Sequence, residues 1–240
     1  MIYEQGSRVI VMTTKEEENG RVKCHGYWPK SAESPVELPE QGIVVSLVSE
    51  STCSESACIV RTLTLSFPSS ARAPRQVTHI QFTGWPDHGV PASPASLLRV
   101  VRLANSVLEG YVRHHLDSAT AVSDIYPGPM VVHCSAGVGR SGTFCVVDAA
   151  LGMLGIRGFG VPPRPLTEAE AAEISVPPRL PGFSPDDPRY DHVYEIVEHF
   201  RLQRPLTVQT PGQFIYCYAA VKQAWTSSGC PPTVPIRERV

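Results

Sequence analysis

The chain has 240 residues, 42% of them hydrophobic, which is enough apolar material for the core of one globular domain. Its formal net charge of −2 gives no electrostatic case for binding nucleic acid or an anionic membrane surface. Its seven cysteines are too irregularly spaced for a disulfide framework, and no apolar run reaches the roughly 18 residues of a membrane span.

These features predict a protein of a reducing compartment, the cytoplasm or alternatively the nucleus, with no signal peptide and no membrane span. Cys53 and Cys58 are spaced unlike a zinc knuckle, and no histidine follows them nearby. We therefore expect neither a metal site nor a cofactor.

Hydrophobic patterning predicts strands in the first third of the chain and helices in the remainder. The expected strands span residues 9–12, 43–48, 58–67 and 77–82, the first of them buried on both faces. The expected helices span residues 93–115, a segment that starts at Ser141, 190–204 and 214–225. Strands followed by helices favour an α+β fold, a mixed β-sheet flanked by helices.

Two polar segments have ordinary explanations when each is considered alone. Residues 16–23 predict a solvated charged hairpin, because the pair Asn19-Gly20 is a strong turn signal. The segment Trp85-Pro86-Asp87 predicts a surface turn stiffened by proline, with Gly84 and Gly89 as pivots on either side.

Residues 134–140, Cys-Ser-Ala-Gly-Val-Gly-Arg, carry the clearest chemical signal in the chain. Gly137 and Gly139 let the backbone turn tightly, so that successive N–H groups can converge on an anion at the start of the following helix. Such surroundings lower a thiol pKa from about 8.5 to roughly 3.5–7.5, and the planar fork of Arg140 can bind two phosphate oxygens. The segment predicts a phosphate cradle with Cys134 as nucleophile. The alternative is a buried structural cysteine beside a glycine turn.

The string from Val132 to Gly142 resembles the signature of the protein-tyrosine phosphatases, Cys-x5-Arg, in the longer form of the classical, tyrosine-specific branch. The resemblance implies a twisted mixed sheet flanked by helices. It also implies hydrolysis of phosphotyrosine in proteins through a phosphocysteine intermediate, with phosphotyrosine-containing proteins as the partners.

The resemblance implies a role for each residue of this loop. Cys134 attacks the phosphorus atom, while Arg140 and the loop amides bind the phosphate. Ser141 hydrogen-bonds the departing thiolate in the second step, and His133 helps to hold Cys134 rather than acting as a base. The residues implied to bind the substrate are Ser135, Ala136, Gly137, Val138, Gly139 and Arg140.

Attack by a thiolate on a phosphate monoester needs an acid that protonates the leaving oxygen, which is worth about 10²- to 10⁴-fold in rate. The segment Trp85-Pro86-Asp87-His88-Gly89 resembles the mobile acid loop of the family. The resemblance implies that Asp87 contacts the substrate as general acid and then serves as general base, with Trp85 in support. Beside the cysteine loop, this interpretation is preferred to a plain surface turn.

Residues 209–214 resemble the glutamine loop of the family, and an amide can orient water because it donates and accepts hydrogen bonds at once. Gln209 is implied to place the water that hydrolyses the phosphocysteine, and Gln213 to support it beside the substrate. Considered alone, the segment is a polar helix N-terminus. Within the hairpin, the resemblance implies that Glu18 braces the loop arginine and that Lys23 reaches the closed acid loop.

Residues 1–226 are expected to form the phosphatase domain, and residues 227–240 a flexible tail. Two departures from the family are expected. A proline-rich insertion at about 158–189, with a short helix candidate at 167–170, is a flexible linker in the preferred interpretation and a docking segment in the alternative. The resemblance begins at Met1, so we expect a domain without its N-terminal part, including the loop whose tyrosine stacks on the substrate ring. The chain would then be a fragment or a divergent short form.

Two functional hypotheses follow. An active protein-tyrosine phosphatase is favoured, because Cys134, Arg140, Asp87 and Gln209 are all intact. The alternative is a catalytically impaired phosphotyrosine-binding or regulatory fragment. A dual-specificity or phosphoinositide phosphatase is disfavoured, because the cysteine loop contains no lysine to meet extra lipid phosphates.

Overall fold

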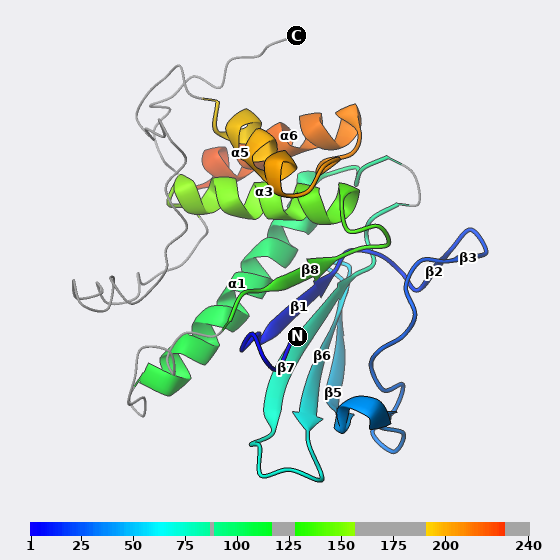
Figure 1. The fold of residues 1–240 in the computed structure, drawn as a ribbon. Coiled ribbons are helices and arrows are strands. Elements are labelled where there is room, and N and C mark those ends of the chain that lie inside the picture. The colour runs from blue at the N-terminus through cyan, green and yellow to red at the C-terminus, as the bar shows by residue number, and fades with distance from the viewer. Residues whose placement is uncertain (87–88, 117–127, 157–190, 229–240) are drawn as a thin grey trace.

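The computed structural model describes residues 1–86, 89–116, 128–156 and 191–228, and Figure 1 draws the fold. Asp87, the insertion predicted at 158–189 with its helix candidate at 167–170, and most of the predicted tail lie outside the described residues. A mixed sheet is flanked by helices, so the predicted fold class is confirmed.

A six-stranded sheet lies at the centre, in the order β4-β5-β6-β7-β1-β8. Its strands are β1 Val9–Met12, β4 Val36–Leu38, β5 Ile43–Cys53, β6 Cys58–Ser66, β7 Arg75–Phe82 and β8 Val131–His133. Strands β4 to β7 pair antiparallel, whereas β1 runs parallel to both β7 and β8. The four predicted strands are confirmed. Strand β5 continues past its predicted end, as far as Cys53. Backbone pairing with β6 extends it, and the sequence shows no sign of this because most of the added residues are exposed and polar and form no apolar pattern.

The predicted charged hairpin is also present, as β2 Glu17–Glu18 and β3 Arg21–Val22. Asn19 and Gly20 both have positive φ, at 52° and 69°, as the two central residues of a type I′ turn require. The hairpin is exposed except for Glu18, whose side chain turns inward and is only 4% exposed.

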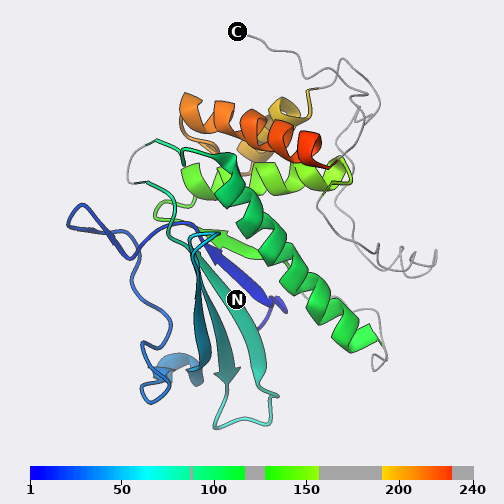
Figure 2. The same ribbon diagram turned by 180° about the vertical axis from the view of Figure 1, so that it is seen from behind.

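The described residues form four α-helices: α1 Pro94–Leu116, α3 Gly139–Met153, α5 His192–Gln203 and α6 Pro211–Ser227. Helices α1 and α3 contact strands of the sheet, whereas α5 packs on α3 and α6 packs on α1 and α3. The predicted helices are confirmed, and the Ser93 hydroxyl accepts a hydrogen bond from the Ala95 N–H at 3.2 Å at the start of α1. Figures 1 and 2 show α3, α5 and α6 grouped beyond one end of the sheet, with α1 running along one face of it.

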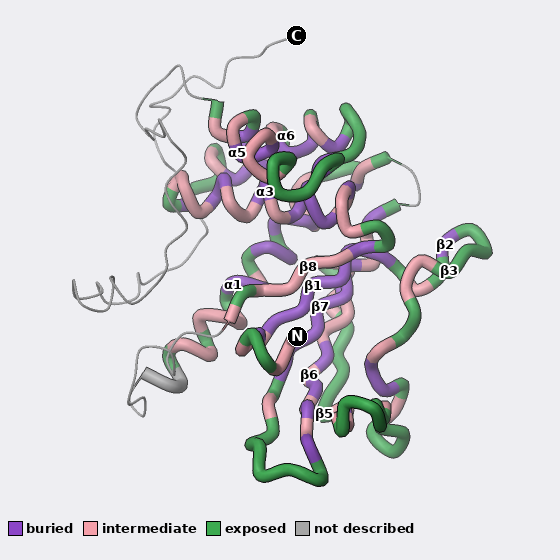
Figure 3. Tube along the Cα trace, in the orientation of Figure 1, coloured by how far each residue is buried: buried purple, intermediate pink, exposed green. Residues whose placement is uncertain are grey.

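Strand β1 is buried on both faces, as its apolar sequence predicted (Figure 3). Alternate side chains point to opposite faces of a strand. Val9 and Val11 therefore join the core on the helix side, while Ile10 and Met12 join a second cluster that contains Trp28. Strand β1 is therefore packed on both sides and gives the neighbouring strands a fixed position in the sheet.

The parallel pairing of β1 and β8 brings the ends of both strands to one edge of the sheet. Met12 pairs with His133, so that the next residues, Thr13 and Cys134, leave the sheet side by side. The carbonyl oxygen of His133 accepts hydrogen bonds from the Thr13 N–H at 2.8 Å and from the Thr13 hydroxyl at 3.1 Å. The start of the cysteine loop is thereby fixed to the most buried strand.

Candidate active site

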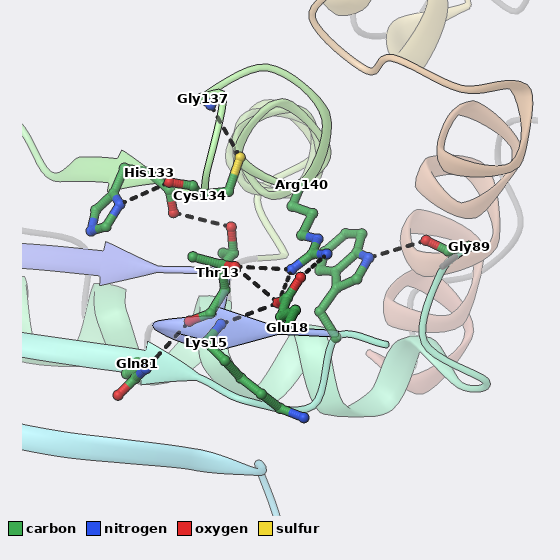
Figure 4. Close-up of polar contacts among 11 residues, drawn as sticks. Thr13, Lys15, Glu18, Gln81, Gly89, His133, Cys134, Gly137 and Arg140 are labelled. Carbon is green, nitrogen blue, oxygen red and sulfur yellow. Dashed lines mark hydrogen bonds and ion pairs between the residues drawn. The ribbon is translucent and has the colours of Figure 1, made fainter. Parts of the chain in front are cut away.

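The loop of residues 134–138 joins β8 to α3 and folds back over the Cys134 thiol (Figure 4). The Gly137 N–H donates a hydrogen bond to Cys134 Sγ at 3.2 Å, and Gly137 has a φ of 70°, which glycine adopts without steric cost. Burial by itself raises the pKa of Cys134. The Ser141 hydroxyl and the N–H groups of Ser141, Gly137 and Val138 outweigh this effect by hydrogen bonding, so the pKa lies below its ordinary value.

The first turn of α3 presents backbone N–H groups to the cysteine loop. Val138 occupies the N-cap position and provides no side-chain cap, so the first N–H groups of the helix can face an anion. The Ser141 side chain is buried, and its Oγ makes no hydrogen bond of normal geometry to a described residue. The same hydroxyl is among the groups that lower the pKa of Cys134.

Arg140 is held by an acidic partner from the hairpin, Glu18 (Figure 4). Its Nη1 lies 2.5 Å from Glu18 Oε1 and its Nη2 lies 2.7 Å from Glu18 Oε2, while Nη1 also donates to Thr14 Oγ1 at 3.1 Å. Three of the five guanidinium N–H groups are thereby used. Among the described residues, no hydrogen bond uses the Nε–H and the second Nη2–H, which lie along one edge of the guanidinium in a geometry suited to two oxygens of one anion.

The Glu18 carboxylate is unusually acidic. Burial by itself raises its pKa. Hydrogen bonds from Arg140, the Lys15 N–H and the Thr14 hydroxyl have the larger, opposite effect, and the resulting pKa is about 2. Glu18 is therefore ionised at every physiological pH, and its charge keeps the guanidinium of Arg140 in place at the mouth of the loop.

His133 holds the backbone of Cys134. Its Nδ1 lies 3.2 Å from the Cys134 carbonyl oxygen, and its Nε2 lies 2.6 Å from the Tyr27 hydroxyl. A carbonyl oxygen can only accept, so Nδ1 carries the proton and the neutral ring accepts from Tyr27 through Nε2. Burial lowers the pKa of His133, which favours this neutral form. Nδ1 is thus occupied by the Cys134 carbonyl oxygen, and Nε2 by the Tyr27 hydroxyl, which fixes the ring.

Gln209 and Gln213 lie together over the first residue of α3. A Cβ added at Gly139 would stand 3.0 Å from Gln213 Nε2 and 3.3 Å from Gln209 Oε1. Gln213 Oε1 accepts hydrogen bonds from the N–H groups of Gln209 and Thr210, and Thr210 completes a capping box at the start of α6. The carboxamide oxygen of Gln213 is therefore used to fix the backbone of Gln209, beside the cysteine loop.

The segment predicted to be the acid loop is anchored at both of its described ends. Trp85 is buried, its ring packs against aromatic rings of β7 and α6, and its Nε1 donates to the Gly89 carbonyl oxygen at 3.1 Å. Asp87 itself lies outside the described residues. Lys23 follows the hairpin, where its N–H donates to the Glu16 carbonyl oxygen at 2.7 Å, and its predicted contact with the acid loop stays a prediction.

Sequence reasoning missed three contributors to this site. Thr13 and Tyr27 hold His133, and Arg204 at the end of α5 donates to the carbonyl oxygens of Ala136 at 3.0 Å and Gly137 at 2.9 Å. Each acts across a gap of tens of residues or more, so no local motif marks it. Only the carbonyl-rich glycine loop, which needs donors on its outer side, could have prompted a search for such a cation.

The described ranges contain neither a metal-binding cluster nor a membrane-spanning helix. The histidine, cysteine and acidic side chains of those ranges form no group of three able to hold a metal ion. None of the helices described is both long and apolar enough to cross a membrane.

Comparisons with known proteins agree with this geometry. The family model "Protein-tyrosine phosphatase" matches residues 1–158. Tyrosine-protein phosphatase non-receptor type 9 of Rattus norvegicus is 34% identical over 237 residues, which are 97% of this chain and 33% of that protein. Receptor-type tyrosine-protein phosphatase C of Mus musculus is 41% identical over 221 residues, 92% of this chain and 13% of that protein.

The fold is similar to a solved catalytic domain as well. The crystal structure of the catalytic domain of human protein tyrosine phosphatase non-receptor type 18 matches with a TM-score of 0.66 and 28% identity, over 92% of this chain and 62% of that chain. The chain thus spans a third or less of the two curated relatives named above. Because the family model matches well over half of its residues, the chain belongs to the protein-tyrosine phosphatase family.

Proposed function

We propose that the chain hydrolyses phosphotyrosine in proteins through a phosphocysteine intermediate. One observation carries the proposal: the Cys134 thiol, with its lowered pKa, and the Arg140 guanidinium, held by Glu18, both lie at the start of α3. A nucleophile and a phosphate-binding fork at one helix N-terminus suit a phosphate monoester dianion. Membership of the family supports a tyrosyl leaving group.

The first step transfers the phosphoryl group to sulfur. The loop N–H groups and the free edge of Arg140 bind the phosphate oxygens, and the Cys134 thiolate attacks the phosphorus atom. The S–P bond forms as the bond from phosphorus to the tyrosyl oxygen breaks, and Asp87 gives its proton to that oxygen. The anchoring of Trp85 to Gly89 supports this role, because it ties together the two ends of the loop that carries Asp87.

The second step releases phosphate. A water molecule oriented by Gln209 attacks phosphorus, Asp87 accepts one of its protons, and the S–P bond breaks. The Ser141 hydroxyl then donates to the departing thiolate, a role supported by its burial and its lack of another acceptor among the described residues. A reducing compartment, as expected from the cysteine usage, would keep Cys134 a free thiol between turnovers.

The test is an assay of the purified chain on a phosphotyrosine peptide and on the matched phosphoserine peptide. We expect turnover of the phosphotyrosine peptide alone, and loss of it in Cys134→Ser. Cys145→Ser is the matched control, since the burial of Cys145 in α3 raises its thiol pKa to about 12 and keeps it unreactive. Binding of the peptide without turnover would contradict the proposal and favour a phosphotyrosine-binding fragment. Equal turnover of phosphoserine would contradict the assignment to tyrosine.

A further inference from the structure

The tip of the β5–β6 hairpin holds two thiols outside the active site. Cys53 is the last residue of β5 and Cys58 the first residue of β6. The two lie directly opposite each other, and residues 54–57 form the turn between them. Opposed Cα atoms in an antiparallel pair are about 4.5–5.5 Å apart. A disulfide needs Cα atoms about 4.4–6.8 Å apart. The backbone therefore already meets the main geometric requirement of a disulfide.

The two thiols have unequal surroundings. Cys58 lies in the main core with 1% of its surface exposed, and burial raises its pKa. Cys53 is partly exposed, and hydrogen bonds from the hydroxyl and N–H of Ser56 lower its pKa. The Ser56 hydroxyl also lies 3.1 Å from Cys58 Sγ, so it contacts both sulfurs. Cys53 is suited to react first with a small oxidant, and Cys58 to react with the oxidised Cys53 and form the disulfide.

The turn between these cysteines supports the segment that leads into the acid loop. The Ala57 carbonyl oxygen accepts hydrogen bonds from the Thr83 N–H at 2.8 Å and the Thr83 hydroxyl at 2.9 Å. A Cβ added at Gly84 would stand 2.9 Å from Ala57 Cβ, so the two backbones are in close contact. The Glu55 carbonyl oxygen accepts from Arg99 of α1 at 2.6 Å. A stiffer turn should therefore also reduce the motion of the backbone at Thr83 and Gly84.

We propose that Cys53 and Cys58 form an oxidisable dithiol, which hydrogen peroxide or another hydroperoxide converts to a disulfide that stiffens the turn beneath Thr83 and Gly84. With hydrogen peroxide, the Cys53 thiolate attacks one peroxide oxygen and the O–O bond breaks. A sulfenic acid forms, and the second oxygen leaves as water. The Cys58 thiolate then attacks the Cys53 sulfur, the S–O bond breaks, and the leaving hydroxide takes up a proton. Two thiols are thus oxidised while the peroxide is reduced to water.

Mass spectrometry of one peptide tests the chemistry. Trypsin cleavage at Lys30 and Arg61 releases residues 31–61, which contain Cys53 and Cys58 and no other cysteine. After brief peroxide treatment of the full chain and alkylation in denaturant, we expect this peptide unalkylated and lighter than its reduced form by two hydrogen atoms, a change that dithiothreitol reverses. Cys53→Ser should abolish the product, and Cys24→Ser, at another partly exposed thiol, should not. Alkylation of both thiols, or higher oxidation of Cys53 alone, would overturn the proposal.

Hydrogen exchange tests the mechanical half without using activity. In a Cys134→Ser background, which removes the active-site thiol, oxidation should slow amide exchange at Thr83 and Gly84. The same treatment of Cys53→Ser in that background should leave exchange unchanged. A disulfide that leaves the exchange of Thr83 unaltered would overturn the stiffening. Any effect on turnover rests on the proposed function, whereas both of these measurements stand if the chain proves inactive.

Discussion

Arg204 at the end of α5 and Gly137 in the cysteine loop are joined by a hydrogen bond from the arginine Nε to the glycine carbonyl oxygen at 2.9 Å. A second bond runs from Arg204 Nη2 to the Ala136 carbonyl oxygen at 3.0 Å. A trans peptide points its C=O and N–H in opposite directions. The two carbonyls held by Arg204 belong to the peptides whose N–H groups, on Gly137 and Val138, hydrogen-bond to the Cys134 thiol. Arg204 thus aims both donors at the sulfur from outside the loop.

Arg204→Ala should therefore raise the pKa of Cys134 and lower kcat/KM for a phosphotyrosine peptide. Because Arg204 is exposed, we expect the variant to lose about 1 kcal/mol of transition-state stabilisation, which is about fivefold in kcat/KM. The pH dependence of Cys134 alkylation by iodoacetamide checks the pKa directly. Arg204→Lys should restore part of the effect, and Arg102→Ala, at an exposed position of α1, should have none. An unchanged alkylation profile in Arg204→Ala would show that the loop holds its own shape.

This contact also explains why sequence reasoning was incomplete. The Cys134–Arg140 loop, the capping box at Thr210 and the hairpin turn are set by neighbouring residues, so short motifs predicted them. Arg204 stands 67 positions from Gly137, and only the packing of α5 against α3 brings them together. A single arginine at a helix end carries no local signal for that contact.

The brace of Arg140 was predictable only through family resemblance. Composition favours a solvated hairpin, and the structure agrees for residues 17–22 with the exception of Glu18. The inward turn of that side chain depends on Arg140, which lies 122 positions later in the chain. The length of β5 was missed for the same kind of reason, because backbone pairing with β6 extends an exposed polar segment.

Glu18→Gln should destabilise the fold and weaken phosphate binding. The change keeps the side-chain volume but leaves Arg140, only 16% exposed, without its counter-charge. Breaking a buried pair in this way costs about 3 kcal/mol. Urea unfolding measures that loss, and KM for a phosphotyrosine peptide should rise. Glu17→Gln, at the exposed neighbouring position, is the matched control and should change neither value. Equal stability of both variants would mean that Arg140 is held by other groups.

The same pair predicts the acid limit of stability. The pKa of Glu18 is lowered on folding from 4.5 to about 2, so its contribution is fully present above pH 4.5 and is lost as the pH falls toward 2. The free energy of unfolding, measured with urea at several pH values in this window, should fall more steeply for the natural chain than for Glu18→Gln. Parallel curves for the two proteins would contradict the assigned pKa shift.

Gly139→Ala should impair the second chemical step more than the first. The added methyl would stand 3.0–3.3 Å from side-chain atoms of Gln213 and Gln209 and displace them from the cysteine loop. Under the proposed mechanism, hydrolysis of the phosphocysteine then slows by at least about tenfold, as expected for a misplaced reacting group. Pre-steady-state kinetics should show a burst of released tyrosine peptide followed by slow turnover. Gly110→Ala, where an added Cβ meets nothing within 4 Å, is the control. A uniform loss in both phases would contradict the role of the glutamines.

The central claim is that Cys134 carries the phosphoryl group. It is tested most directly by mixing Gln209→Ala, in which hydrolysis should be slow, with a phosphotyrosine peptide and quenching in acid within seconds. Mass spectrometry should then find one added phosphoryl group on the peptide that contains Cys134, and none in Gln209→Ala combined with Cys134→Ser. Release of phosphate at the natural rate with no phosphorylated cysteine at any time would contradict the account.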